Sequence, residues 1–219
     1  MSQNTSSAVM QQRSEPHDSL DDFPTQPWAT RALCEHVLKG CHLASKTVWE
    51  PACNRMHMAA PLAEYFRSVA SSDVHDYGIE PDTNGFPFQY DFLFMGKSPI
   101  VNSDWIISNP PFRLAEQFIA RARDLATEGV AMIVRTSFLE GVGRYENLFS
   151  KNPPSIVAQF SERVPMVKGR LTATGSTATS YCWLVWLNGV TTTKLVWIPP
   201  CRKKLERADD YAAYREVAA

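Results

Sequence analysis

The stretch Asp104-Trp-Ile-Ile-Ser-Asn-Pro-Pro-Phe112 decides the fold expected for this chain and the chemistry that it could perform. Its apolar residues 105–107 predict a buried strand, and the two prolines fix φ and remove two backbone donors, so the strand must end there in a rigid loop. Such a loop holds the side-chain oxygen of Asn109 and the carbonyl of Pro110 at the carboxyl end of the strand, beside the ring of Phe112. Two aligned acceptors next to an aromatic ring suit an exocyclic amino group on a planar base.

The chain contains a second Asn-Pro-Pro sequence, Asn152-Pro-Pro-Ser155, which serves as an internal control. This copy lacks both the aromatic residue and a preceding apolar strand, so we interpret it as an ordinary loop. For the first copy, the structural alternative is a strand-terminating turn with a buried Phe112, and the flanking sequence has to decide between the two interpretations.

The composition predicts a soluble α/β protein with one core. The chain has 219 residues, of which 44% are hydrophobic and 21% charged, and its net charge is −1. No apolar run reaches the roughly 18 residues that a membrane span needs, and no secretory signal is visible, so we expect a cytoplasmic protein without a membrane partner. The five cysteines and five histidines show no metal-ligand spacing, which predicts no metal site.

Short apolar runs alternate with helical patterns along residues 22–207, which we predict to form a single domain between a disordered tail (1–21) and a C-terminal tail (208–219). Strands are expected at 47–49, 68–73, 90–93 (weak), 105–108, 129–134, 156–160, 181–187 and 194–198. Helices are expected at about 27–40, 58–67, 114–125 and 144–149. This alternation predicts a mostly parallel, Rossmann-like sheet with helices on both faces.

Acidic residues stand at the ends of three predicted strands: Glu50, Asp73 and Asp91. In open α/β sheets, ligands bind beyond the carboxyl ends of the strands. An acid after the second strand suits a ribose, because a carboxylate can accept hydrogen bonds from two neighbouring hydroxyls. Asp73 occupies that place. A solvated loop carboxylate is the alternative for each acid taken alone.

These motifs occur in an order that resembles the small, phage-type DNA N6-adenine methyltransferases, from about Phe23 to Arg207. The matching stretches are Asp22-Phe-Pro-Thr-Gln-Pro-Trp-Ala-Thr-Arg-Ala-Leu33, Val48-Trp-Glu-Pro-Ala-Cys53, Ser72-Asp-Val-His-Asp-Tyr-Gly78, Asp91-Phe-Leu93, the turn at 109–112, Glu140-Gly-Val-Gly-Arg-Tyr145 and Gly175-Ser-Thr-Ala-Thr-Ser-Tyr-Cys-Trp-Leu-Val-Trp186.

The resemblance implies a class I methyltransferase fold with a seven-stranded sheet, S-adenosylmethionine as cofactor and adenine-containing DNA as substrate. It implies catalytic roles for Asn109, Pro110, Pro111 and Phe112. The implied cofactor contacts are Thr25, Pro27, Trp28, Glu50, Pro51, Ala52, Cys53, Asp73, Asp91 and Asn109. Within that family, the Glu50 loop approaches the methionine part, the Asp73 position binds ribose, and the Asp91 position lies near adenine.

One departure from the family concerns the loop Cys53-Asn-Arg-Met56, where the family has glycine, any residue, glycine. Glycine allows positive φ and a close approach of the ligand to the backbone. Asn54 can adopt the left-handed conformation at modest cost. Met56 is predicted either to fill volume meant for the methionine part or to turn away into the following helix.

Basic side chains near the predicted site are candidate DNA contacts. Arg113 directly follows the catalytic turn, and Lys168 and Arg170 lie in a polar loop at 165–180, where backbone contacts to DNA could arise. A solvated arginine and a flexible connector are the respective alternatives, and a further basic cluster at 201–207 is interpreted as a solvated segment.

Competing functions are a methyltransferase acting on RNA adenine or protein glutamine, and a non-catalytic nucleic-acid-binding protein of the same fold. A nicotinamide-dependent reductase is excluded because no GxGxxG follows the first strand. The recognition sequence, self-association and any specificity partner are left open by the sequence.

Overall fold

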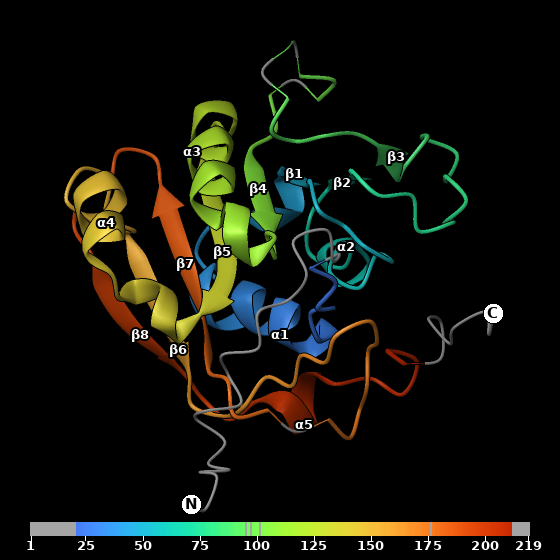
Figure 1. Cartoon of the computed structure of the whole chain (residues 1–219). Coiled ribbons are helices and arrows are strands. Elements are labelled where there is room, and N and C mark those ends of the chain that lie inside the picture. Colours follow the sequence, from blue (N-terminus) through green and yellow to red (C-terminus); the bar gives the residue numbers. More distant parts are fainter. Residues whose placement is uncertain (1–20, 95, 97, 101, 176, 212–219) are drawn as a thin grey trace, which may run out of the picture.

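An eight-stranded mixed sheet forms the centre of the computed structural model, which describes residues 21–211 except Met95, Lys97, Val101 and Ser176 (Figure 1). The strand order is β3-β2-β1-β4-β5-β7-β6-β8. The strands are β1 (Thr47–Glu50), β2 (Ser68–Asp73), β3 (Phe88–Gln89), β4 (Trp105–Ser108), β5 (Gly129–Arg135), β6 (Ile156–Phe160), β7 (Tyr181–Leu187) and β8 (Lys194–Ile198).

The central strands of the sheet run in the same direction, so their carboxyl ends lie side by side. The strands from β3 to β5 are parallel, whereas β7 lies antiparallel between β5 and β6, and β8 runs parallel to β6. β1 pairs with β2 on one side and with β4 on the other, so the chain order reverses there. In such sheets the crevice for ligands opens beyond the carboxyl ends of these central strands.

The predicted Rossmann-like class is confirmed, with two differences in the strands. The sheet has eight strands rather than seven, because β8 adds to the edge along the whole of β6. The weak strand predicted at 90–93 is wrong: the pairing residues are Phe88–Gln89, next to Ser72 and Asp73, and the chain then turns at Phe92 and Leu93. Only two residues pair, so no apolar run marks this strand.

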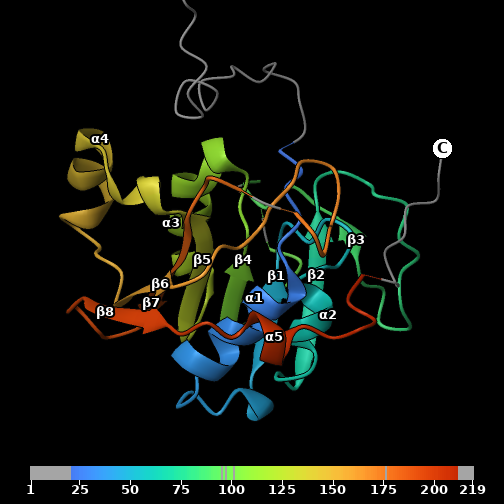
Figure 2. The ribbon, with the colours of Figure 1, turned by 90° about the horizontal axis from the view of Figure 1, so that it is seen from below.

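Helices cover both faces of the sheet (Figure 2). Their bounds are α1 (Pro27–Ala32, continued by a π-helical turn Leu33–Val37), α2 (Ala59–Leu62), α3 (Ala115–Leu125), α4 (Val142–Arg144, continued by a π-helical turn Tyr145–Phe149) and α5 (Arg202–Leu205). Short 3₁₀ turns lie at Leu43–Ser45, Phe112–Leu114 and Thr136–Leu139. α1, α2 and α5 pack on one face, and α3 packs on the other.

α2 is shorter than the helix predicted at 58–67. After Leu62 the backbone bonds tighten, since the amides of Glu64 and Tyr65 donate to carbonyls three residues back rather than four. The chain therefore leaves the helix before it enters β2.

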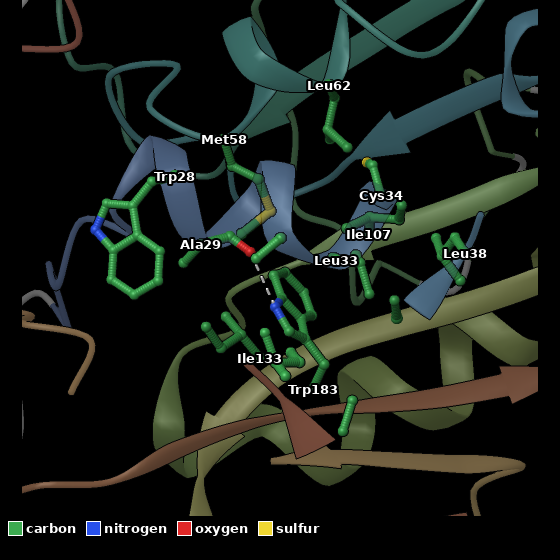
Figure 3. Packing of buried hydrophobic residues seen from close by; sticks show 14 of the residues in the cluster. Trp28, Ala29, Leu33, Cys34, Leu38, Met58, Leu62, Ile107, Ile133 and Trp183 are labelled. Atoms are coloured by element: carbon green, nitrogen blue, oxygen red, sulfur yellow. Dashed lines mark hydrogen bonds between the residues drawn. The ribbon is translucent and has the colours of Figure 1, made fainter. Parts of the chain in front are cut away.

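The α1 face of the core is built around a tryptophan from β7. Trp183 is fully buried, and its indole nitrogen donates to the carbonyl of Ala29 in α1 at 3.2 Å (Figure 3). Leu33 and Ile133 pack in the same cluster. Truncating such an aromatic side chain costs about 3–5 kcal/mol, so this contact holds α1 firmly on the sheet.

The ordered domain continues past residue 207, where the C-terminal tail was predicted to begin. Asp210 is buried and accepts two hydrogen bonds from the buried Arg31 guanidinium, which also binds Glu64. Residues 212–219 and 1–20 of the predicted tails lie outside the described part. Among the described residues, no helix is both long and apolar enough to cross a membrane.

Candidate functional site

A cavity of about 290 Å³ opens beyond the carboxyl ends of β1, β2 and β4, close to the lower limit of about 300 Å³ for small-molecule sites. It includes most of the predicted cofactor contacts. The lining residues are Asp21, Phe23, Pro24, Thr25, Glu50, Pro51, Ala52, Cys53, Asn54, His57, Met58, Asp73, Val74, His75, Tyr77, Asp91, Phe92, Leu93, Asn109, Pro111, Leu114 and Phe118.

Two lining side chains carry buried polar atoms that meet no hydrogen-bond partner among the described residues. These are Oε2 of Glu50 and Oγ1 of Thr25. Burial raises the pKa of the Glu50 carboxyl well above its usual value, and the neighbouring Asp73 raises it further, whereas the backbone amide of Ala59 acts in the opposite direction. A cationic ligand group beside Glu50 would relieve this cost, because it stabilises the ionised carboxylate.

The loop that departs from the family pattern keeps the glycine-like backbone. Asn54 has φ 51° and Met56 has φ 67°, so both residues adopt the left-handed conformation that glycine normally serves. Met56 does not line the cavity. The side chain of Asn54 instead makes a new contact, donating to Asp22 at 2.6 Å.

The acids Asp73, at the end of β2, and Asp91, after β3, both line the cavity. The Asp73 carboxylate accepts the amides of Asn54 at 2.9 Å and His75 at 3.0 Å, which fixes its orientation. Burial raises the pKa of Asp73, and these two amides lower it. Asp91 is exposed and accepts the amide of Leu93. Each carboxylate has acceptor capacity left for further donors.

The amide of Asn109 has a forced orientation. Its nitrogen donates to the carbonyl oxygen of Phe23 at 2.8 Å. A carbonyl can only accept, so the NH₂ group must face Phe23, which fixes the position of the oxygen. No described residue donates to Oδ1 of Asn109 or to the carbonyl of Pro110. Neither acceptor at the end of β4 has a donor among the described residues, and Asn109 lines the cavity.

The ring of Phe112 does not line the cavity and packs in a group of three with Phe23 and Arg135. Its centroid is 5.2 Å from that of Phe23, and the guanidinium of Arg135 lies 4.1 Å from it. Arg135 is also 5.9 Å from the ring of Phe23. The group thus forms an aromatic and cationic border beside the two free acceptors.

A short N-terminal strap, residues 21–23, joins the parts of this site. Asp21 accepts the amide of Phe112, while Asp22 accepts from Asn54 and Arg55 and gives its carbonyl to the amide of Gly169. Phe23 holds Asn109, as described above. The strap therefore links the turn at 109–112, the loop Cys53–Met56 and the loop after β6.

Some predicted site residues lie elsewhere. Pro27 and Trp28 do not line the cavity, because both are buried in the first turn of α1, where Trp28 packs edge-on against Phe160 at 5.7 Å. Pro110 is also buried and does not line the cavity, although its carbonyl accepts no hydrogen bond from a described residue. The candidate DNA contacts Arg113, Lys168 and Arg170 are all exposed. Burial raises the pKa of Asp21, and the charges of Arg113 and Lys168 oppose this rise.

Sequence reasoning placed Asp22 and Phe23 in a family-like stretch without giving them individual roles, and it missed Asp21, His57 and Arg135. Burial lowers the pKa of His57 to about 4, so this lining side chain is neutral at pH 7. Arg135 is the charged last residue of the apolar strand β5, which pairs with β4. A charged residue at that position was the sequence feature that could have marked it as a site residue. Among the described residues, no group of three or more His, Cys, Asp or Glu could hold a metal.

The arrangement can bind an elongated ligand with a cationic end at Glu50 and Thr25, a diol near Asp73 and a planar ring among Val74, Phe92 and Leu93. It can also hold a planar amino group at Asn109 and Pro110. The two ligands would meet at the end of β4, where Asn109 lines the cavity.

No protein-family model matches the chain, and no curated protein matches it. Solved structures show similarity of fold. The chain is similar to the M protein of the type I restriction enzyme EcoKI, with a TM-score of 0.59 and 12% identity over 83% of this chain and 50% of that one.

A second similar structure is the methyltransferase subunit of a type I restriction-modification system from Streptococcus thermophilus. Its TM-score is 0.56, with 11% identity over 87% of this chain and 50% of that one. The chain thus spans about half the length of both proteins, and at these identities the likeness establishes the fold.

Proposed function

We propose that this protein is an S-adenosylmethionine-dependent methyltransferase that acts on the N6 amino group of adenine in DNA. The observation that carries the proposal is the forced orientation of Asn109, whose nitrogen is held by Phe23 and whose oxygen is left for a donor. Adenine N6 offers two N–H bonds, which match the two free acceptors of Asn109 and Pro110.

The residues of the cavity fit the cofactor. Oε2 of Glu50 and Oγ1 of Thr25 are buried and have no partner within the described part of the chain, so they would suit the ammonium and the carboxylate of a methionine group. Asp73 is placed for ribose hydroxyls, and Asp91 and Phe92 for an adenine ring. The left-handed backbone of Asn54 and Met56, and the position of Met56 outside the cavity lining, support an active enzyme over a degenerate, non-catalytic relative.

The chain's own residues would orient the target. Asn109 and Pro110 accept the two N–H bonds and so raise the electron density on nitrogen, while Phe112 packs on the base after it leaves the helical stack. A bound S-adenosylmethionine would supply a methyl group on a cationic sulfur, and Glu50, Thr25 and Asp73 would hold it beside Asn109. Placement of the acceptors, rather than a strong base, lowers the barrier.

DNA is favoured over the other substrates by three features. The motif order resembles the phage-type DNA adenine enzymes, the fold is similar to modification subunits of restriction systems, and basic side chains border the site. RNA adenine and protein glutamine present similar amino groups and are separated from DNA by the experiment.

The proposal is tested by calorimetric titration of the purified protein with S-adenosylmethionine and S-adenosylhomocysteine, followed by mass spectrometry of three treated substrates: adenine-containing DNA, RNA and a glutamine peptide. We expect micromolar binding of both cofactors and N6-methyladenine in DNA. Absence of cofactor binding to a folded sample would overturn the proposal, and methylation of RNA or peptide alone would reassign the substrate.

A further inference from the structure

The strap ends in a carboxylate that lies against the catalytic turn. Asp21 accepts the backbone N–H of Phe112, whose ring is covered by the guanidinium of Arg135. Loss of hydration raises the pKa of Asp21, and the Phe112 amide, Arg135, Arg113 and Lys168 all act in the opposite direction. One carboxylate therefore faces a backbone donor and three cationic side chains.

Arg135 is the best positioned of these cations. It is the last residue of β5, the strand next to β4, so the sheet rather than a flexible loop sets its place beside the turn. Its Nε–H is buried and meets no acceptor among the described residues. A buried guanidinium donor without an acceptor is costly, so Nε of Arg135 calls for an acceptor beyond the described residues, and an anion suits it best.

We propose that the Phe112 amide and the side chains of Arg135, Arg113 and Lys168 form a subsite for a backbone phosphate of the nucleic acid, which Asp21 occupies when no nucleic acid is bound. The inference rests on the proposed function and deepens it, because it assigns a binding site to the nucleotide that carries the target base.

The chemistry of the site fits a phosphodiester. In a nucleotide the phosphate is separated from the base by one sugar, so a base held at Asn109 brings its own backbone to the neighbouring Phe112. A guanidinium fork binds two phosphate oxygens at once, and a backbone amide can bind a third. Asp21 mimics part of this pattern with a single charge, and a phosphodiester replaces it with an anion of the same charge and more acceptor oxygens.

The test uses a single-stranded, adenine-containing oligonucleotide in the presence of S-adenosylhomocysteine, with affinity measured by fluorescence anisotropy. A second oligonucleotide carries neutral methylphosphonates on both sides of the target adenine. Asp21→Asn removes the competing charge but keeps an oxygen for the Phe112 amide. Arg135→Met keeps an apolar stem over the ring and removes the charge. Asp209→Asn and Arg67→Met are matched controls, since both residues are exposed and lie away from the cavity.

We expect Asp21→Asn to bind the normal oligonucleotide about threefold to tenfold more tightly, and Arg135→Met to bind it about tenfold more weakly, with a shallower salt dependence. Both effects should vanish on the methylphosphonate oligonucleotide, and the controls should stay within about twofold of wild type. Unchanged affinity of both variants, or equal effects on the two oligonucleotides, would overturn the subsite.

The same samples separate this inference from the proposed function. If wild type transfers methyl groups but neither variant changes the oligonucleotide affinity, the proposed function is retained and the phosphate subsite is rejected. Charge-dependent oligonucleotide binding without any cofactor binding removes the function and leaves the subsite standing. If Asp21→Asn binds an acidic peptide more tightly than wild type does but does not bind the oligonucleotide more tightly, the phosphate assignment is overturned.

Discussion

The two Asn-Pro-Pro turns of this chain share a sequence and differ in where the sheet places them. Asn109–Pro111 follows the carboxyl end of β4, whereas Asn152–Pro154 precedes the amino end of β6. β6 runs parallel to β5 and β4, because each of β5 and β6 is antiparallel to β7. The two turns therefore lie at opposite edges of the sheet.

The difference shows in how the acceptors are used. In the second turn, the carbonyl of Asn152 accepts the indole N–H of Trp186 at 2.9 Å, and that of Pro154 accepts the hydroxyl of Thr193 at 2.7 Å. In the first turn, no described residue donates to the Asn109 side-chain oxygen or to the Pro110 carbonyl. The same rigid tripeptide thus stabilises the fold at one edge and leaves its acceptors to a ligand at the other.

The largest effect is expected from removing the first asparagine side chain. Asn109→Ala should lower the rate of methyl transfer at least about 100-fold, because one of two preorganised acceptors is lost in the transition state. Initial rates with saturating cofactor measure this. The matched variant Asn152→Ala should change the rate less than about twofold, since it lies at the other edge. Retention of more than about a tenth of the wild-type rate by Asn109→Ala would contradict the assigned role.

The next effect concerns Glu50, which gives the first turn a neighbouring cofactor site that the second turn lacks. Glu50→Gln should weaken S-adenosylmethionine binding about 30-fold, as expected for the loss of a charged hydrogen-bond partner. The same variant should unfold at a higher temperature than wild type at about pH 8, because it removes a buried carboxylate with an unpaired oxygen. Calorimetric titration tests the weaker binding, and thermal unfolding tests the higher unfolding temperature.

The difference in stability between wild type and Glu50→Gln should depend on pH, because the pKa of Glu50 is raised. A neutral Glu50 contributes stability below its ordinary pKa of 4.5, and this contribution is lost as pH rises through the higher folded-state pKa. The stability advantage of Glu50→Gln should therefore shrink as pH falls toward that value. Cofactor binding by wild type should weaken over the same range. A constant difference between the two proteins would contradict the assignment.

The fourth residues of the two turns, Phe112 and Ser155, should have opposite roles: the first affects the KM for nucleic acid, and the second affects stability. Phe112→Ala should raise the KM for nucleic acid about tenfold, within the range of about 1–3 kcal/mol for stacking of one base, with little loss of stability. Ser155 is buried, accepts the Leu187 amide at 2.9 Å and donates to Val190. Ser155→Ala should therefore cost about 1–3 kcal/mol of stability and leave the KM unchanged.

Chemical unfolding and steady-state kinetics on both variants separate these effects. A stability loss from Phe112→Ala as large as that from Ser155→Ala, with an unchanged KM, would mean that the first turn is a structural element like the second.

The sequence predicted most of the sheet because its strands are apolar runs that end in turn residues. β4 and β7 are examples, since every residue of β4 is buried and β7 is buried except at its last residue. The two-residue β3 was misplaced because so short a pairing carries no periodic pattern. The acids Glu50, Asp73 and Asp91 were predicted to share a site because the carboxyl ends of parallel strands meet at one edge.

The strap could not be predicted from local patterns. Its partners are distant in the chain: Phe23 holds Asn109, Asp21 holds Phe112, and Asp22 holds Asn54. None of these pairs has a periodic signature, and each depends on how the sheet brings the segments together. For the same reason, sequence alone left open where the side chain of Met56 would lie.

The smallest effect is expected from Met56, where the comparison of the turns could still fail. If this side chain blocked the cavity, the first turn would have no methyl donor beside it and would be as inert as the second. Met56→Gly should leave the S-adenosylmethionine dissociation constant within about threefold of wild type, because Met56 does not line the cavity and glycine adopts the same positive φ. Relief of left-handed strain and the greater flexibility of glycine in the unfolded chain act in opposite directions, so stability should change by less than about 1 kcal/mol. Asn54→Gly sharpens the result, because it also restores the family's glycine but breaks the hydrogen bond to Asp22 and should loosen the strap. A gain in affinity of tenfold or more from Met56→Gly, measured by calorimetry, would show that methionine had taken the place of the ligand.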